Sequence, residues 1–348
     1  MSFRGHASET PLTTAEGFAV PQPGHVFSFP HDHGSHPDFK IEWWYLTGHL
    51  FATDGRRFGY QATFFRNASS DKTAELHLAH MALTDVATGK FYYQERLNRE
   101  GWDAGASTTT LAVHNGPWSL CFADAATEQM TLRGGIRAEA GFNLTLAPVK
   151  PLVVFGENGV SRKGAAPTAA SYYLTFPRLR TEGVLTLGAE RLKVSGETWM
   201  DHEISSSQLD QNQVGWDWVS IQLKDGRELM FYRMRLRDGT ADPASSLTWV
   251  DAGGKTHRSD FTWEVLDHWT SPTTGAVYPS RVRLTATDPA NGKASAFTLE
   301  PLVKNQELTG HLDGIPYWEG ACRVLDAEGR ETGSSYLELT GYAHDLKL

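Results

Sequence analysis

Three ionisable side chains stand side by side in the segment SGETWMDHEISSS, which spans residues 195–207. Asp201, His202 and Glu203 begin two places after a tryptophan, and a polar run follows them. Alternate residues of a strand share one face, so Trp199, Asp201 and Glu203 are expected on one face. His202 is expected on the other face. The three charged groups therefore do not converge on one metal ion unless a β-bulge intervenes.

This pattern favours a carboxyl group beside a tryptophan at the wall of an apolar cavity. Desolvation raises the pKa of a carboxyl group in such a place, so that it can carry a proton near neutral pH. Asp201 is then a candidate general acid, and Glu203 or His202 can orient water or accept a proton. The alternative is a strand end whose carboxylates face water, and both interpretations stay open at the level of sequence.

A second ionisable cluster lies in the segment PHDHGSHPDF and comprises His31, Asp32, His33, His36 and Asp38. Zinc sites combine histidines at short spacing with a carboxylate. Here, however, two prolines impose turns, and no second histidine pair at helical spacing follows. We therefore predict a hydrogen-bonded polar turn that leads into the first strand, with no metal and no cofactor.

The next segment, IEWWYLTGHL at residues 41–50, alternates in the same way as the first. Glu42 and Trp44 are expected on one face, and Trp43 and Tyr45 on the other. The rings either pack on both sides of a strand or form a pocket wall with a polar group.

Two other kinds of site find no support, because the chain has neither the Gly-x-Ser-x-Gly turn of a serine hydrolase nor a phosphate-binding loop.

Strand-length segments broken by turn signals position these residues. No long segment has the apolar spacing of a helix, and short strands at even spacing predict a sandwich or barrel. Asp225-Gly226 marks a hairpin turn. The polar stretch at 205–213 fits a link between two β-domains, and residues 1–25, which lack periodicity, predict a mobile arm.

The composition excludes some classes of protein. The net charge of −9 over 348 residues argues against a nucleic-acid binder, and no apolar run reaches the roughly 20 residues of a membrane helix. The 11 Trp, 11 Tyr and 17 Phe suit an apolar binding surface. Cys121 and Cys322 form no disulfide framework and leave both their redox state and the compartment open. No signal peptide follows Met1, which fits either a cytoplasmic protein or a mature form whose leader was removed.

Six segments together carry a family resemblance: FSFPHDHGSHPDFKIEWWYLTGHL, AHMALTD, GETWMDHEISSSQL, GWDWVSIQLKDGRELMFYRMR, YWEGACRV and SYLELTGY. Between Phe27 and Tyr342 they resemble, in order, the AttH-like family of lipocalin-like proteins, which is related to the carotenoid 1,2-hydratases (hydroxyneurosporene synthases). The resemblance implies an all-β fold of two consecutive lipocalin-like antiparallel β-barrel domains, at 26–208 and 209–348, after the arm at 1–25. It also implies a periplasmic or secreted bacterial protein. Many relatives are labelled secreted hydrolases, a label that no motif of this sequence supports.

The resemblance further implies an elongated lipophilic ligand of the isoprenoid, carotenoid or polyene type, and its acid-catalysed hydration or cyclisation. In the hydratases, an Asp two places after a Tyr is thought to act as the acid, with a His and a Trp on an upstream strand. Asp201 matches this Asp, and Trp199 stands at the Tyr position. The upstream strand corresponds roughly to 171–180, where Tyr172 and Tyr173 stand and no histidine is present. A non-catalytic carrier of the same kind of ligand is the alternative.

The catalytic candidates are thus Asp201, Glu203 and His202. The predicted ligand-binding residues are Trp199, Glu42, Trp44, Tyr45, His80, Tyr172, Tyr173, Trp216, Trp218, Trp318 and Glu319. The expected partner is a lipophilic small molecule, with no nucleic acid and no transmembrane segment, and association with a membrane surface is left open.

Overall fold

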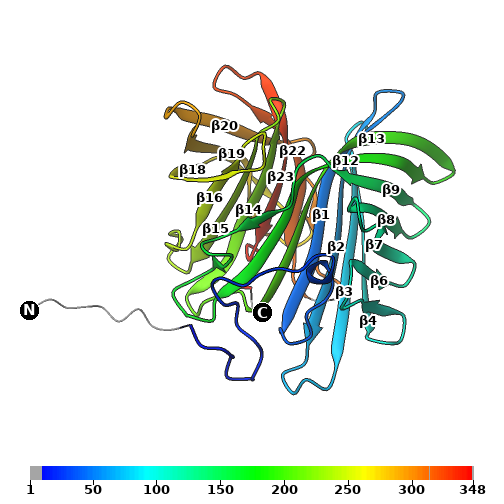
Figure 1. The fold of residues 1–348 in the computed structure, drawn as a ribbon. Coiled ribbons are helices and arrows are strands. Elements are labelled where there is room, and N and C mark those ends of the chain that lie inside the picture. Colours follow the sequence, from blue (N-terminus) through cyan, green and yellow to red (C-terminus); the bar gives the residue numbers. More distant parts are fainter. Residues whose placement is uncertain (1–9, 313, 347–348) are drawn as a thin grey trace, which may run out of the picture.

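The computed structural model describes residues 10–312 and 314–346, and strands dominate it (Figure 1). Two antiparallel sheets stand next to each other, the first curled into a nearly closed barrel and the second into a half-barrel. A single short 3-10 helix, η1 (His31–His33), is assigned among the described residues. The predicted all-β fold with two lipocalin-like barrels is therefore confirmed.

The first sheet has the strand order β4-β3-β2-β1-β13-β12-β9-β8-β7-β6-β5, with β10 and β11 paired to β12. Its strands are β1 (Ile41–Ala52), β2 (Arg57–Ala68), β3 (Glu75–Asp85), β4 (Lys90–Arg99), β5 (Ala104–Ala106), β6 (Ala112–Asn115), β7 (Trp118–Asp124), β8 (Gln129–Ile136), β9 (Ala140–Pro148), β10 (Val153–Phe155), β11 (Ser161–Arg162), β12 (Ala170–Leu187) and β13 (Glu190–Ser207). The central strands β1, β12 and β13 carry most of the candidate site residues.

The second sheet has the order β17-β16-β15-β14-β23-β22-β20-β19-β18, with β21 paired to β22. Its strands are β14 (Gln213–Leu223), β15 (Glu228–Leu236), β16 (Ser246–Val250), β17 (Thr256–Ser259), β18 (Phe261–Thr270), β19 (Val277–Thr287), β20 (Ala294–Pro301), β21 (Glu307–Leu308), β22 (Tyr317–Leu325) and β23 (Glu331–Thr340). Residues 208–212 join the two sheets, and Asp225-Gly226 lies in the turn between β14 and β15.

The alternation of side chains along the strands separates three apolar clusters. Trp44, Leu46 and their neighbours fill the first barrel, and Val219 and Ile221 belong to the interior of the second. Residues that alternate with these along the strands point out of the barrels. Among them, Tyr45, Trp199 and Trp218 belong to a third cluster, where the two sheets face each other. Both faces of the central strands are therefore buried, one inside a barrel and one between the sheets.

Part of the N-terminal segment packs against the first sheet. Phe18 and Val20 are buried, and the backbone N–H of Gln22 donates to Tyr172 Oη at 2.8 Å. Ser206 Oγ donates to the carbonyl oxygen of Ala19 at 2.6 Å. Two apolar side chains and these hydrogen bonds thus hold residues 18–22 against the first sheet. The mobility of the arm at 1–25 stays a prediction, and residues 1–9 of it lie outside the described residues.

A glycine allows the two sheets to approach closely. A Cβ atom on Gly59 of β2 would lie 2.4 Å from Ala321 Cβ and 2.9 Å from Tyr336 Oη, both on the second sheet. We predict that Gly59→Ala lowers the free energy of unfolding by about 1–3 kcal/mol, the usual cost of overpacking, as measured by urea denaturation. In Gly135→Ala, the control, the new Cβ would meet its nearest atom at 3.6 Å. Equal stability of the two variants would contradict this account of the interface.

Candidate functional site between the two sheets

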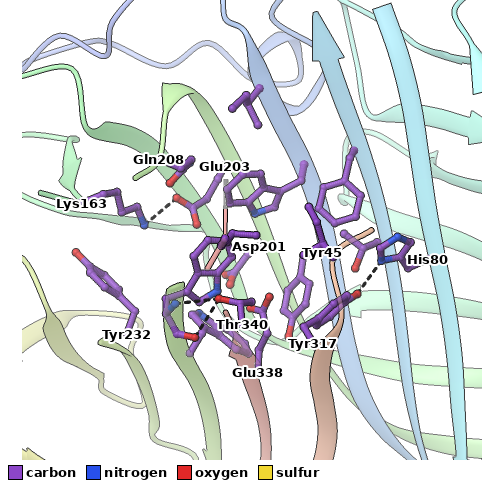
Figure 2. A pocket seen from close by; sticks show the side chains of 18 of the residues that line it. Tyr45, His80, Lys163, Asp201, Glu203, Gln208, Tyr232, Tyr317, Glu338 and Thr340 are labelled. Atoms are coloured by element: carbon purple, nitrogen blue, oxygen red, sulfur yellow. Dashed lines mark hydrogen bonds and ion pairs between the residues drawn. The ribbon is translucent and has the colours of Figure 1, made fainter. Parts of the chain in front are cut away.

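A cavity of about 150 Å³ lies between the two sheets, and both sheets supply its walls (Figure 2). Its lining is mostly aromatic and aliphatic, with a small number of polar groups, which is typical of a site for a small lipophilic molecule. The lining residues are Ile41, Trp43, Tyr45, Thr63, Phe65, Asn67, Leu78, His80, Lys163, Tyr173, Asp201, Glu203, Gln208, Trp216, Trp218, Tyr232, Met234, Ile315, Tyr317, Glu338, Thr340 and Leu346.

Strand register places two rows of side chains opposite each other across this cavity. In the first sheet, Asp201 of β13 pairs with Tyr45 of β1 and with Thr175 of β12. In the second sheet, Glu338 of β23 pairs with Trp218 of β14 and with Glu319 of β22. Residues directly opposite in an antiparallel pair share a face, so each set forms one row.

Two hydrogen bonds connect the sheets at these rows. Tyr45 Oη donates to Glu319 Oε1 at 2.7 Å, and Trp218 Nε1 donates to Tyr173 Oη at 2.8 Å. These contacts fix the distance between the walls at the middle of the cavity.

Asp201 is 2% exposed and accepts three hydrogen bonds. Tyr173 Oη donates to Oδ2 at 2.7 Å, while Thr175 Oγ1 and Trp199 Nε1 donate to Oδ1 at 2.5 and 2.7 Å. Burial raises the pKa of Asp201 to about 7, although these hydrogen bonds act in the opposite direction. The carboxyl group can therefore hold or release a proton near neutral pH.

Glu203, on the same strand face as Asp201, is held in an ion pair at one end of the cavity. Lys163 Nζ lies 2.9 Å from Glu203 Oε2, and Ser171 Oγ donates to the same oxygen. The ammonium group also lies 4.5 Å from the ring centres of Tyr173 and Tyr232. Figure 2 shows this pair on the opposite side of the cavity from His80. Lys163 thus places a positive charge against Glu203 at this end of the cavity.

The other end of the cavity is polar as well. His80 Nδ1 lies 2.7 Å from Tyr317 Oη, and Gln61 Nε2 donates to the same hydroxyl at 3.1 Å. An aromatic middle section thus lies between two polar ends, an arrangement that suits an elongated molecule with polar groups toward its ends.

Two carboxyl groups stand on the wall contributed by the second sheet. Glu338 is half-buried, and burial raises its pKa to about 7. Glu319 lies behind it, fully buried, and burial raises its pKa well above the usual range, with the nearby charge of Glu338 adding to the shift. These surroundings therefore favour the neutral, protonated form of Glu319.

Three predicted site residues lie elsewhere, inside the first barrel. His202 Nε2 contacts Glu42 Oε1 at 2.9 Å, and the ring of His202 stacks on Trp44 with centroids 4.8 Å apart. Arg66 Nε donates to the second oxygen of Glu42 at 3.1 Å. The structure therefore does not place His202, Glu42 or Trp44 in the cavity, because they point to the opposite strand face from Asp201.

The remaining predicted residues divide into three groups. Tyr172 faces the N-terminal segment, and Trp318 lies in the second barrel, where its Nε1 donates to the carbonyl of Lys304 at 2.8 Å. Trp199 and Glu319 lie directly behind the cavity wall and touch its lining through the hydrogen bonds given above. The structure brings the following predicted residues together at the cavity: Tyr45, His80, Tyr173, Asp201, Glu203, Trp216 and Trp218.

The histidine-rich segment forms the predicted polar turn before β1. His36 Nδ1 lies 2.8 Å from Glu42 Oε1, and His31 Nδ1 lies 2.7 Å from Asp32 Oδ1. Among the described residues, ligand atoms come close enough for a cation in three groups: His31, Asp32 and His36; His36, Glu42 and His202; and Glu75, His77 and Glu100. In the second group the guanidinium of Arg66 already neutralises Glu42, which disfavours a metal there. The absence of a metal at His31, His33 and His36 stays a prediction.

Sequence reasoning missed several polar residues of the cavity, among them Lys163, Tyr317 and Glu338. One signal was available, because Tyr336, Glu338 and Thr340 alternate in SYLELTGY and so share a strand face. Lys163 comes from a loop and Tyr317 from the first residue of a strand, and neither position has a periodic pattern around it.

Within the described part of the chain, no helix is both long and apolar enough to cross a membrane.

Comparisons with known proteins agree with this architecture. The model of the AttH-like family matches residues 20–342. A crystal structure of an AttH from Nitrosomonas europaea has a TM-score of 0.84 at 35% identity, covering 93% of this chain and all (100%) of that chain. Curated proteins give no match.

Two more distant crystal structures share the fold. Kievitone hydratase from Nectria haematococca has a TM-score of 0.70 at 16% identity, with 97% of both chains covered. CghA with Sch210972 has a TM-score of 0.58 at 15% identity, covering 95% of this chain and 98% of that one. Because the family model matches almost the whole length of this chain, the chain belongs to the AttH-like family.

Proposed function

We propose that this protein transforms an elongated lipophilic molecule of the isoprenoid or polyene type, by hydrating or cyclising an alkene, with Asp201 as the general acid. The observation that carries the proposal is a buried carboxyl group, with its pKa raised to about 7, in the wall of an aromatic cavity. A general acid works best when its pKa is near the working pH. The name of the fold relative kievitone hydratase supports the same class of reaction.

The first chemical step is transfer of a proton from the Asp201 carboxyl to one alkene carbon. The π electrons form the new C–H bond, and the other carbon becomes a carbocation. The Asp201 carboxylate that remains is stabilised by the donors on Tyr173, Thr175 and Trp199, whose hydrogen bonds strengthen as the negative charge develops. The three donors that stabilise the Asp201 carboxylate are thus in place before the proton leaves.

The carbocation then faces aromatic rings. Tyr45 and Trp218 line the cavity, with ring centroids 5.0 Å apart and nearly perpendicular planes. A cation over such rings gains about 0.5–2 kcal/mol. Water adds to the cation in a hydration, whereas a second double bond of the substrate attacks it in a cyclisation.

Isotope labelling tests this function. Kievitone and the isoprenoids geraniol and farnesol are incubated with the protein in ¹⁸O-labelled water and analysed by mass spectrometry, with heat-denatured protein as the control. We expect a product in which labelled oxygen is bound to carbon, or an isomer of unchanged mass and new ring structure. If the protein is instead a non-catalytic carrier, the ligand should bind and be recovered unlabelled and chemically unchanged.

A further inference from the structure

Glu338 is the carboxyl group of the second sheet that lines the cavity. It faces the wall that carries Asp201, as Figure 2 shows, and it is half-buried. Trp218 and Glu319 flank it on the neighbouring strands β14 and β22. A ligand in the cavity therefore lies between a carboxyl group of the first sheet and one of the second.

Glu338 has no cation partner within the described ranges, since no ion pair there includes it. The nearest lysine of the lining, Lys163, is paired with Glu203 at 2.9 Å. Trp216 contributes a hydrogen bond to Glu338. An indole N–H can only donate, and a carboxyl group can accept in either protonation state. This bond therefore holds Glu338 in place, and it lowers the pKa of Glu338 and so favours the carboxylate.

The environment of Glu319 supports the inference that Glu338 exchanges protons with water or ligand in the cavity. Glu319 is 1% exposed, it accepts a hydrogen bond from Tyr45 on Oε1, and its Oε2 has no hydrogen-bond partner among the described residues. Of two carboxyl groups on adjacent strands, the deeper one retains its proton because it is less solvated. Glu338, which opens to the cavity, is then the member that ionises.

We propose that Glu338 is the proton acceptor of this site and that its negative charge faces the cationic intermediate. The inference rests on the proposed function. In a hydration, water forms a C–O bond with the carbocation and one O–H bond of that water breaks, with its proton going to the Glu338 carboxylate. Asp201 has lost a proton and Glu338 has gained one, so the net reaction is addition of water. Proton exchange with solvent then restores both groups, while the hydrogen bond from Trp216 positions Glu338.

The protonation states required by this step are compatible with the surroundings of the two acids. Asp201 must start protonated and Glu338 ionised, and burial places the pKa of each at about 7. The activity should therefore have a bell-shaped pH dependence centred near neutrality. The titratable and charged groups around Glu338 are Asp201 and Glu203 on β13, Glu319 and Tyr317 on β22, Tyr45 on β1, His80 on β3, Tyr173 on β12, Tyr232 on β15 and Lys163.

A binding experiment tests the charge of Glu338 without any turnover. Geranyltrimethylammonium is compared with a neutral analogue that has a tert-butyl group in place of the trimethylammonium group, at a pH one to two units above neutrality. Wild-type protein should prefer the cation, and Glu338→Gln should lower the ratio of the two affinities about tenfold or more. The control is Glu264→Gln, an exposed glutamate of the same sheet. An undiminished preference in Glu338→Gln would overturn the assignment.

The pH profile of kievitone or geraniol hydration tests the proton acceptor. Glu338→Gln should lose about 10²–10⁴-fold in kcat and lose the acidic limb of the profile, while the alkaline limb due to Asp201 remains. A smaller kcat with both limbs intact would mean that Glu338 has a structural role and would overturn the inference. If the wild type neither hydrates nor cyclises any probe, the proposed function fails, and the binding comparison alone decides whether Glu338 presents a charge to a cation.

Discussion

An Asp201→Asn protein should fold and bind geraniol as the wild type does, yet turn over its substrate about 10²–10⁴-fold more slowly. The amide has nearly the shape of the acid, and its oxygen can still accept from Thr175 and Trp199. It cannot, however, release a proton to an alkene. Single-turnover kinetics with the substrate found by ¹⁸O labelling, together with thermal denaturation and tryptophan fluorescence quenching, measure these quantities.

The Asp201 carboxyl accounts for the alkaline limb of the pH dependence of the wild-type rate. The general acid is active only when protonated, so on that limb the rate should fall as the pH rises above about 7, the pKa that burial gives Asp201. Full activity in Asp201→Asn would remove Asp201 from the mechanism. Loss of folding in the same variant would instead assign Asp201 a structural role as the acceptor of three hydrogen bonds.

The largest expected effect on stability belongs to Arg66. We expect Arg66→Met to lower the free energy of unfolding by about 3–5 kcal/mol, because it leaves a buried carboxylate without its cation. Arg66 is fully buried, and its guanidinium lies 3.1 Å from Glu42 and 3.0 Å from Glu75. It also donates to the carbonyl oxygens of His36 and Phe39, so it ties the segment before β1 to β2.

Urea denaturation of Arg66→Met and of a matched surface variant measures this effect. Arg283→Met removes an exposed arginine that lies 2.9 Å from Glu264, and such a pair contributes about 0–1 kcal/mol. Equal losses in the two variants would show that the buried network is not a main source of stability. Burial opposes ionisation of Glu42, but hydrogen bonds from His202 and His36 hold its pKa well below the usual range. The stability due to Glu42 is therefore present above its ordinary pKa and is lost as the pH falls toward the lowered value.

Strand alternation let the sequence predict which residues share a face, but not what each face meets. Trp199, Asp201 and Glu203 point between the sheets and His202 points into the first barrel, as the period of two requires. Glu42 and Trp44 were predicted to bind ligand, yet they lie inside that barrel. Both faces of β1 are buried, so hydrophobicity could not distinguish the barrel interior from the space between the sheets.

The pairing of distant segments was the other limit of the sequence. Glu338 lies far along the chain from Asp201, and the two meet only because β1 with β13 and β14 with β23 place their rows face to face. Lys163 reaches the cavity from a loop, where no periodic pattern constrains the direction of a side chain. The family resemblance supplied the fold and the matching Asp, while the second wall of the site required the structure.

A crystal structure of the protein with bound kievitone or geraniol tests the central claim most directly. We predict the ligand between the two sheets, with an alkene carbon about 3–3.5 Å from Asp201 Oδ2, the near-attack distance for proton transfer, and with Glu338 on the other side of the same double bond. A ligand seated inside the first barrel, beside Trp44 and His202, or with its double bond remote from Asp201, would contradict the account.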